Sequence, residues 1–224
     1  MVEFRNILMA RIKTEFGWDD PGVLITCGLS GALTLAIMAT VNPGDEVLMA
    51  DPFFVSYKHL TNMFGGKCVY INTYPEFHLT PAQCEACVSP KSKLLLLNSP
   101  GNPHGAVYTT EELKNLADFA RKHQLLVISD EIYDRLVYGE HKHVCFSSLP
   151  SMRERTILLG GFSKDYAMTG WRIGYAAGPA SLIKGLVRIH QYSVMSAPTI
   201  SQYAALEALK VGEPYVEQMR AEYD

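Results

Sequence analysis

Short apolar runs alternate with segments of helical period along nearly the whole chain. The runs predict strands over residues 23–27, 46–50, 67–71, 93–98, 125–129, 156–160 and 173–177. Several of these runs are apolar on both faces, which is typical of strands buried in a parallel sheet. The segments between and after them predict helices over residues 30–41, 55–64, 80–88, 110–123, 181–192 and 199–211. This alternation predicts an α/β fold in which helices cover a largely parallel sheet.

Composition narrows the class of protein. A chain of 224 residues with 48% hydrophobic and 19% charged residues indicates a globular protein of about one domain, and excludes collagen, coiled coil and disorder. The net charge of −3 offers no basic excess for nucleic acid. The apolar runs are shorter than a membrane helix, and residues 1–6 do not resemble a secretory signal. We therefore expect a cytoplasmic protein without nucleic-acid or membrane partners.

The cysteines agree with a reducing compartment. They are odd in number and scattered among the predicted strands and helices, unlike a disulfide framework: Cys27, Cys68, Cys84, Cys87 and Cys145. The sequence Cys84-Glu-Ala-Cys87 supplies half of a zinc motif, and only the HKHVC stretch at residues 141–145 offers further compact ligands. We interpret Cys84 and Cys87 as two inert thiols on a surface helix, and we predict no metal site.

Polar and small residues gather where the predicted strands end, which is where open α/β sheets bind ligands. The stretch Gly28-Leu29-Ser30-Gly31-Ala32 runs straight into a predicted helix. Its backbone N–H groups and serine hydroxyl form either a phosphate site or an ordinary helix cap. After the second strand, Asp51-Pro52-Phe53-Phe54 places an aromatic ring either in the core or against a planar ligand.

Two further strand ends carry polar side chains. The turn NSPGNPHG at residues 98–105 holds the Asn102 amide at the sheet edge, either for structure or for a ligand. Asp130 follows a fully apolar run, where an uncompensated carboxylate would be costly. We expect either a cationic partner for Asp130 or a helix cap.

A lysine and an arginine follow the sixth strand. Lys164 lies in a small-residue setting, Gly160-Gly161-Phe162-Ser163-Lys164, where partial burial would free its amine to act as a Schiff-base nucleophile. Arg172 supplies a planar fork suited to phosphate. Phosphate donors, an aromatic ring, an acid and a lysine therefore converge on one edge of the sheet.

Three motifs carry a family resemblance. The segments NPHG, SDEIY and SKDYAMTGWRIGY resemble the Asn-Pro-x-Gly, Asp-x-x-Tyr and lysine signatures of class I and II aminotransferases, which are pyridoxal-phosphate enzymes of fold type I. Their order and spacing match, and the resemblance covers essentially all 224 residues. It implies pyridoxal 5′-phosphate as cofactor and a three-layer αβα domain with a mostly parallel mixed sheet.

The resemblance implies roles for the residues around the cofactor ring. Lys164 would form the Schiff base and then shuttle the proton between the substrate Cα and the cofactor C4′. Asp130 would keep the pyridinium nitrogen protonated. Asn102 and Tyr133 would hydrogen-bond the 3′ oxygen of the ring, and Phe54 would stack on its face.

It also implies a set of phosphate ligands. The backbone N–H of Leu29, the hydroxyl of Ser30 and the guanidinium of Arg172 would hold the phosphate, assisted by the helix dipole. Many relatives carry a hydroxyl three residues before the lysine, where this chain has Gly161. Ser163 is the candidate that compensates for it.

The implied activity is transfer of an amino group between an amino acid and a 2-oxo acid, by a homodimer. A C–S β-lyase or a cyclopropane-forming ACC-synthase-like enzyme on the same scaffold is an alternative, as is a catalytically incomplete cofactor-binding fragment. Residues 1–224 resemble the large domain alone. In the family, an N-terminal arm and a C-terminal small domain flank this domain, and the resemblance places both outside residues 1–224. It also places outside them the arginine of the small domain that binds the substrate carboxylate, and a tyrosine that reaches the phosphate from the partner subunit.

Overall fold

A computed structural model describes residues 1–224 and contains one seven-stranded sheet. The strands are β1 (Gly22–Cys27), β2 (Glu46–Asp51), β3 (Lys67–Asn72), β4 (Ser92–Asn98), β5 (Leu126–Asp130), β6 (Thr156–Gly161) and β7 (Ile173–Gly178). They lie in the order β1-β7-β6-β5-β4-β2-β3. Only β7 is antiparallel to its neighbours, β1 and β6, and all other pairs are parallel. The predicted mostly parallel mixed sheet is confirmed.

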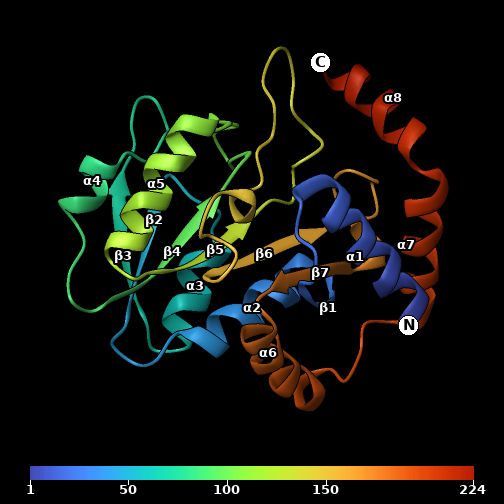
Figure 1. Cartoon of the computed structure of the whole chain (residues 1–224), viewed down its shortest axis with the longest axis horizontal. Helices are drawn as coiled ribbons and strands as arrows, with labels where there is room; N and C mark the ends of the chain where they lie inside the picture. Colours follow the sequence, from blue (N-terminus) through green and yellow to red (C-terminus); the bar gives the residue numbers. More distant parts are fainter.

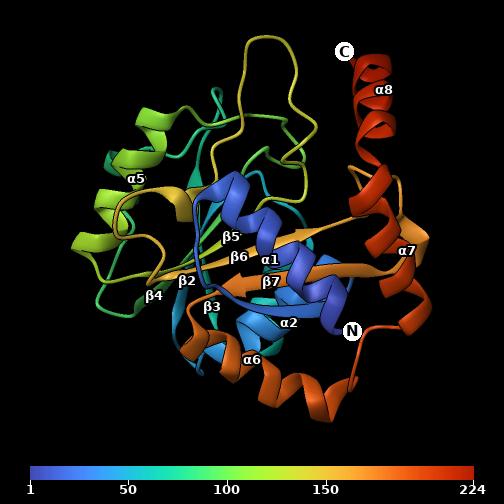
Figure 2. The ribbon, with the colours of Figure 1, turned by 45° about the vertical axis from the view of Figure 1, so that its right-hand side comes forward.

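Helices cover both faces of the sheet and make three layers (Figure 1). On one face lie α2 (Gly28–Thr40), α3 (Ser56–Met63) and α6 (Ala180–Ser193). On the other lie α1 (Val2–Phe16), α4 (Pro81–Glu85), α5 (Thr110–Lys122) and α7 (Thr199–Val211). The last helix, α8 (Glu213–Tyr223), extends from the edge of the body beside α7, as the turned view shows (Figure 2).

The core explains why the central strands are apolar on both faces. In β4, Leu94 and Leu96 pack into the core under α2, while Leu95 and Leu97 pack into the core under α5. All four side chains are at most 2% exposed. Because successive side chains of a strand point to opposite faces, only a continuous apolar run fills both cores.

Two helices were not predicted. The helix α1 buries Phe4, Leu8 and Ile12, which recur at every fourth position, and it ends at Gly17, whose φ is 66°. The helix α8 has only one buried residue, Val216, so its sequence carries almost no apolar periodicity.

The interpretation of the cysteine pair is wrong for one of its members. Cys84 is fully buried in the core between α4 and α5, and Cys87 is half-buried. Burial raises the pKa of the Cys84 thiol to about 12. The helix itself is shorter than predicted and begins with a capping box formed by Thr80 and Gln83.

All five cysteines are free thiols. No cluster of three or more His, Cys, Asp or Glu side chains in residues 1–224 is arranged to hold a metal ion. None of the helices combines the length and the apolar character needed to cross a membrane.

Candidate active site

A cavity of about 300 Å³ opens where β1, β4, β5 and β6 end, and it brings together every residue predicted for the cofactor site. Those residues are Leu29, Ser30, Phe54, Asn102, Asp130, Tyr133, Ser163, Lys164 and Arg172. The structure adds Tyr57, Asn98, Ile132 and Thr169 to the lining. A cavity of this size falls at the small end of those that hold cofactors and small substrates.

One corner of the cavity is suited to an anion. The helix α2 begins at Gly28, directly after β1, and no side chain caps it, so the interpretation of this turn as an ordinary side-chain cap is wrong. The N–H groups of its first turn, including those of Leu29 and Ser30, are free of intrahelical partners. A helix N-terminus of this kind attracts negative charge.

Arg172 completes that corner. Gly28 has φ of 70°, and a Cβ built there would lie 2.4 Å from Nη2 of Arg172. Only glycine therefore allows the guanidinium to lie against the first turn of α2. The opposite nitrogen, Nη1, donates to the carbonyl oxygen of Thr169 at 2.8 Å, which fixes the fork beside the free N–H groups.

Asp130 forms the buried end of the cavity, with 2% of the residue exposed. The hydroxyl of Tyr57 donates to its Oδ2 at 2.7 Å, and the N–H of Ile132 donates to its Oδ1 at 3.3 Å. Burial raises the pKa of the Asp130 carboxyl to about 6, although both hydrogen bonds oppose the rise. No helix follows β5, so the alternative of a helix cap is wrong, and the side-chain partner of this carboxylate is a neutral phenol rather than a cation.

Asn98 connects Asp130 to the turn that carries Asn102. Its side-chain Nδ2 donates to the carbonyl oxygen of Asp130 at 2.9 Å, and its Oδ1 accepts the N–H of Asn102 at 2.7 Å. The two hydrogen bonds fix the position of the Asn102 backbone relative to β5. The Asn102 amide thus lines the cavity from a rigid support.

Lys164 lies on the loop after β6, with its Nζ 5.7 Å from the centroid of the Tyr133 ring. This is a cation–π distance. The side chain is exposed, so the partial burial expected for its amine is not found, because the cavity is open to solvent at this end. Its neighbours Ser163 and Asp165 are buried and anchor the loop on either side.

Packing explains why this chain has Gly161 where many relatives carry a hydroxyl side chain three residues before the lysine. A Cβ there would lie 2.9 Å from Cδ1 of Ile132 and 3.4 Å from the carbonyl oxygen of Ile173. A side chain at this position would therefore push Ile132 out of the cavity wall. The hydroxyls of Ser163 and Thr169 line the cavity instead.

Phe54 and Tyr57 form an aromatic wall. Phe54 is half-buried, packs against the core under α2 and also lines the cavity, so contact with the core does not remove it from the site. The Tyr57 ring meets it edge to face, with centroids 5.6 Å apart. Sequence reasoning missed Tyr57, which lies in the first turn of α3 and whose contact with Asp130 spans 73 positions, so no local pattern marks it.

A second cavity, of about 790 Å³, lies beside the first and shares Asn102 and Tyr133 with it. The ring of His104 stacks on Phe77 in its wall, with centroids 5.5 Å apart. Burial, and repulsion from His78, lower the pKa of His104. The NPHG turn therefore contributes Asn102 to both cavities and its other three residues to the second.

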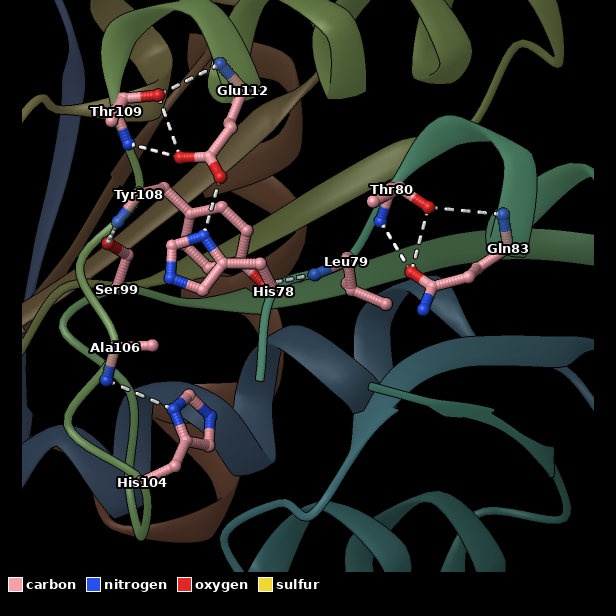
Figure 3. A network of polar contacts seen from close by, with 10 residues as sticks. All are labelled: His78, Leu79, Thr80, Gln83, Ser99, His104, Ala106, Tyr108, Thr109 and Glu112. Atoms are coloured by element: carbon pink, nitrogen blue, oxygen red, sulfur yellow. Dashed lines mark hydrogen bonds and ion pairs between the residues drawn. The ribbon is translucent and has the colours of Figure 1, made fainter. Parts of the chain in front are cut away.

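Figure 3 shows the network that supports this wall. Glu112 accepts the N–H of Thr109 at 2.7 Å through one oxygen, and its other oxygen lies 2.6 Å from Nδ1 of His78. The hydroxyl of Tyr108 accepts the N–H of Leu79 at 2.9 Å. One carboxylate thus caps α5 and holds the segment opposite the NPHG turn.

Comparison with known proteins gives a consistent result. Residues 2–224 match the family described as "Aminotransferase class I and II". The chain is 39% identical to an aspartate aminotransferase of Geobacillus stearothermophilus, over 97% of this chain and 56% of that protein. An aromatic aminotransferase from Pyrococcus horikoshii OT3 has a TM-score of 0.96 at 38% identity, with 100% and 62% of the two chains covered. For an aspartate aminotransferase from Thermus thermophilus with maleate, the TM-score is 0.94 at 38% identity, with coverages of 99% and 59%.

The chain spans about three fifths of the length of these relatives. The family depends on pyridoxal 5′-phosphate, and the cavity contains a group of suitable chemistry for the ring nitrogen, the ring face and the phosphate of that molecule. A buried carboxylate of raised pKa suits a ring nitrogen that carries a proton, the Phe54 ring suits a planar face, and the Arg172 corner suits a phosphate. On the match over residues 2–224, the shared fold and this fit, the chain belongs to the class I and II aminotransferase family.

Proposed function

We propose that this protein is an aminotransferase that moves an amino group between an amino acid and a 2-oxo acid, with residues 1–224 as its large, cofactor-binding domain. The observation that carries the proposal is the convergence of Lys164, Asp130 and Arg172 on one cavity beside the free N-terminus of α2. When bound, pyridoxal phosphate supplies an electron sink for the negative charge that develops at the substrate Cα.

The residues around the ring would share its binding. Asp130 would hold the ring nitrogen, because its Oδ2 and Oδ1 are already oriented by Tyr57 and Ile132. Asn102 and Tyr133 would donate to the 3′ oxygen. Phe54 would cover one face of the ring.

The phosphate would lie at the start of α2. The N–H of Leu29 and the hydroxyl of Ser30 would donate to it from the first helical turn, and Arg172 would pair with its charge. Ser163 is the hydroxyl on the lysine loop that stands in for the missing side chain at Gly161. Binding here combines a helix dipole with a fixed guanidinium fork.

Lys164 would act first as the covalent anchor of the cofactor and then as the base at the substrate Cα. Its Nζ takes the proton from Cα and carries it to the accepting atom, which is general acid–base catalysis by an amine. Tyr133 limits where Nζ can move, since the ring lies 5.7 Å away.

Assembly and location belong to the same proposal. Four large apolar side chains between the end of α6 and the first half of α7 are 60–88% exposed: Tyr192, Met195, Ile200 and Tyr203. Exposed apolar surface of this kind favours a protein interface, and we propose a homodimer. The odd, scattered set of cysteines supports a cytoplasmic location. The substrate carboxylate would be bound by residues outside 1–224.

The test is reconstitution of the full chain with pyridoxal phosphate, followed by absorption spectroscopy. The visible band of the lysine-bound cofactor is expected in the wild type and in Lys114→Ala, a control at an exposed lysine on α5, and is expected to be absent from Lys164→Ala. A band that survives Lys164→Ala would refute the assignment.

A screen of amino acids in the absence of a 2-oxo acid then separates the reaction types. Stoichiometric formation of a 2-oxo acid, with the amino group kept by the cofactor, supports transamination. Continuous release of pyruvate and ammonia without an acceptor contradicts it and indicates a lyase.

A further inference from the structure

A buried ion pair lies directly behind the candidate active site. Glu131, the residue after Asp130, places its Oε2 2.9 Å from Nε2 of His143, and the two side chains are 3% and 9% exposed. Neither atom has a hydrogen-bond partner, so the ion pair is the polar contact that each of them makes. The second oxygen of Glu131 accepts the hydroxyl of Ser129 at 2.7 Å and the N–H of Phe146 at 3.0 Å.

Glu131 thereby ties together both ends of one loop. The chain leaves β5 at Glu131 and returns at His143 and Phe146, where a short 3₁₀ helix, η1 (Phe146–Ser148), begins. Figures 1 and 2 show this segment as the long yellow loop that extends away from the sheet. At the base of the loop the Glu131 carboxylate contacts His143 and Phe146, and farther out Arg135 pairs with Glu15 of α1 and Glu213 of α8.

The tied loop carries part of the site. Tyr133 lies near its start and lines both cavities, while Tyr138 and His141 line the second cavity from its outer part. Asp130 immediately precedes Glu131. Any displacement of the loop base would therefore move Tyr133, and the Ile132 N–H that donates to the Asp130 carboxylate, relative to Lys164.

The charges around His143 favour an ionised pair. Burial disfavours a charged imidazole, but the adjacent Glu131, with Asp134 on the loop and Glu15 on α1, raises the pKa of His143 above its ordinary value. Arg135 faces the same region and pairs with Glu15 at 3.1 Å. From α1, Arg11 also pairs with Glu15 at 3.0 Å, and the Phe16 ring contacts the imidazole edge on.

We propose that Glu131 and His143 are positioning residues: their buried ion pair holds the loop between β5 and η1 closed and so fixes Tyr133 and Asp130 for cofactor binding. The cofactor part of this statement rests on the proposed function, whereas the loop part does not. Removing one partner leaves the other charge buried without compensation, which opens the loop.

The first experiment uses the full chain without cofactor and measures hydrogen–deuterium exchange by mass spectrometry. His143→Gln keeps a hydrogen-bond donor but no charge, and Glu131→Gln keeps the acceptor for Ser129 and Phe146. Both are expected to exchange the loop amides about tenfold faster than the wild type at pH 7. His123→Gln, which removes a partly exposed histidine–glutamate pair at 3.0 Å between the end of α5 and Glu85 of α4, is the control and is expected to leave the loop unchanged.

The second experiment measures the Kd for pyridoxal phosphate between pH 6 and pH 9. In the wild type, two quantities should rise together as His143 loses its proton: the Kd, and the rate of loop exchange after correction for its intrinsic pH dependence. In His143→Gln both should already be high and should lack this rise, whereas the fall in Kd between pH 6 and about pH 7 that follows ionisation of Asp130 should remain in both proteins. A merely structural role would lower thermal stability without removing the rise.

The outcomes separate the two proposals. Loop exchange in His143→Gln and Glu131→Gln equal to that of His123→Gln would overturn the positioning role, whatever the cofactor does. Faster loop exchange together with no cofactor binding by any variant or by the wild type would uphold the role of the pair in closing the loop and refute the proposed function. Faster exchange with an unchanged Kd would overturn the link between the loop and the cofactor.

Discussion

Replacing Tyr57 by phenylalanine tests how Asp130 is kept ionised. The substitution removes only the hydroxyl that donates to Oδ2 of Asp130 at 2.7 Å, and the edge-to-face contact with Phe54 remains. Asp130 is buried with a pKa of about 6, which is only about one unit below physiological pH. A further rise in this pKa would therefore leave much of the carboxyl group protonated and neutral. The Tyr57 hydroxyl is the side-chain donor that opposes this rise.

The magnitude follows from the strength of the lost bond. A hydrogen bond to a charged group contributes about 1.5–3 kcal/mol, and 1.36 kcal/mol corresponds to one pH unit, so the pKa of Asp130 should rise by about one to two pH units. At pH 7 the ionised fraction of the carboxylate would fall from about 90% to between roughly 50% and 10%. Because only the carboxylate can hold a protonated ring nitrogen, the affinity for pyridoxal phosphate should fall by about two- to tenfold at pH 7.

The assay is a titration with pyridoxal phosphate, followed by absorbance, from pH 5 to pH 9.5. Asp130 has a raised pKa, so the binding-competent form is lost as pH falls through that pKa, and the variant should lose it at higher pH than the wild type. The two proteins should therefore converge in Kd at the alkaline end. Tyr108→Phe is the matched control, since it removes another buried, hydrogen-bonded phenol that does not contact Asp130.

Two results would refute this reasoning. A Kd in Tyr57→Phe that is raised by the same factor at every pH would mean that the hydroxyl shapes the cavity and does not tune the carboxylate. A Kd profile identical to that of Tyr108→Phe would mean that the hydrogen bond has no consequence for binding.

Three further substitutions have expected outcomes. Gly28→Ala should weaken phosphate binding by about tenfold or more, because its Cβ would meet the Arg172 guanidinium. Calorimetry with inorganic phosphate measures this loss of affinity. Asp165→Asn should gain thermal stability relative to the wild type as pH rises from 5 to 9. Burial, and then the neighbouring Asp134, hold the pKa of Asp165 well above its usual range. Folding of the wild type therefore takes up a proton, and the wild type loses stability with rising pH. Thr109→Ala removes the capping box of α5 and should cost about 1 kcal/mol, seen as a fall in Tm of about 2–4 °C.

Each of these has its own control. Gly44→Ala introduces a side chain at another positive φ, of 90°, with nothing within 4 Å, so phosphate binding reduced equally there would contradict the contact with Arg172. A stability difference between Asp165→Asn and the wild type that shrinks with rising pH would contradict a raised pKa. Thr109→Ala with an unchanged Tm would mean that Glu112 holds the helix start without the threonine hydroxyl.

The strands could be predicted from the sequence because burial on both faces leaves a plain signal. The run at residues 93–98 became β4, Ser92–Asn98, with an error of one residue. The helices at the two ends were missed for different physical reasons. The periodic Phe4, Leu8 and Ile12 of α1 were a usable signal, whereas α8 buries only Val216 and has no apolar face to read.

Residues of the site could be predicted where a local motif marks them and were missed where only a long-range contact does. Asn102, Asp130 and Lys164 each lie in a short motif at a strand end, so their convergence follows from the topology of a parallel sheet. Tyr57 and His143 act through single contacts with residues on other elements, and no local pattern marks them. The stretch that contains His143 was interpreted only as a potential half of a zinc site.

The single antiparallel strand is what brings Arg172 to the phosphate corner. Arg172 immediately precedes β7, and β7 runs opposite to β1 and β6, so its first residues lie at the edge where the parallel strands end. The contact is close: a Cβ at Gly174 would lie 2.6 Å from the backbone of Gly28 and Leu29. A parallel β7 of the same six residues would begin at the opposite edge, roughly 20 Å away at about 3.3 Å per residue. The mixed character of the sheet, and the glycines that let its strands approach α2, are therefore requirements of the anion site and not incidental features of the fold.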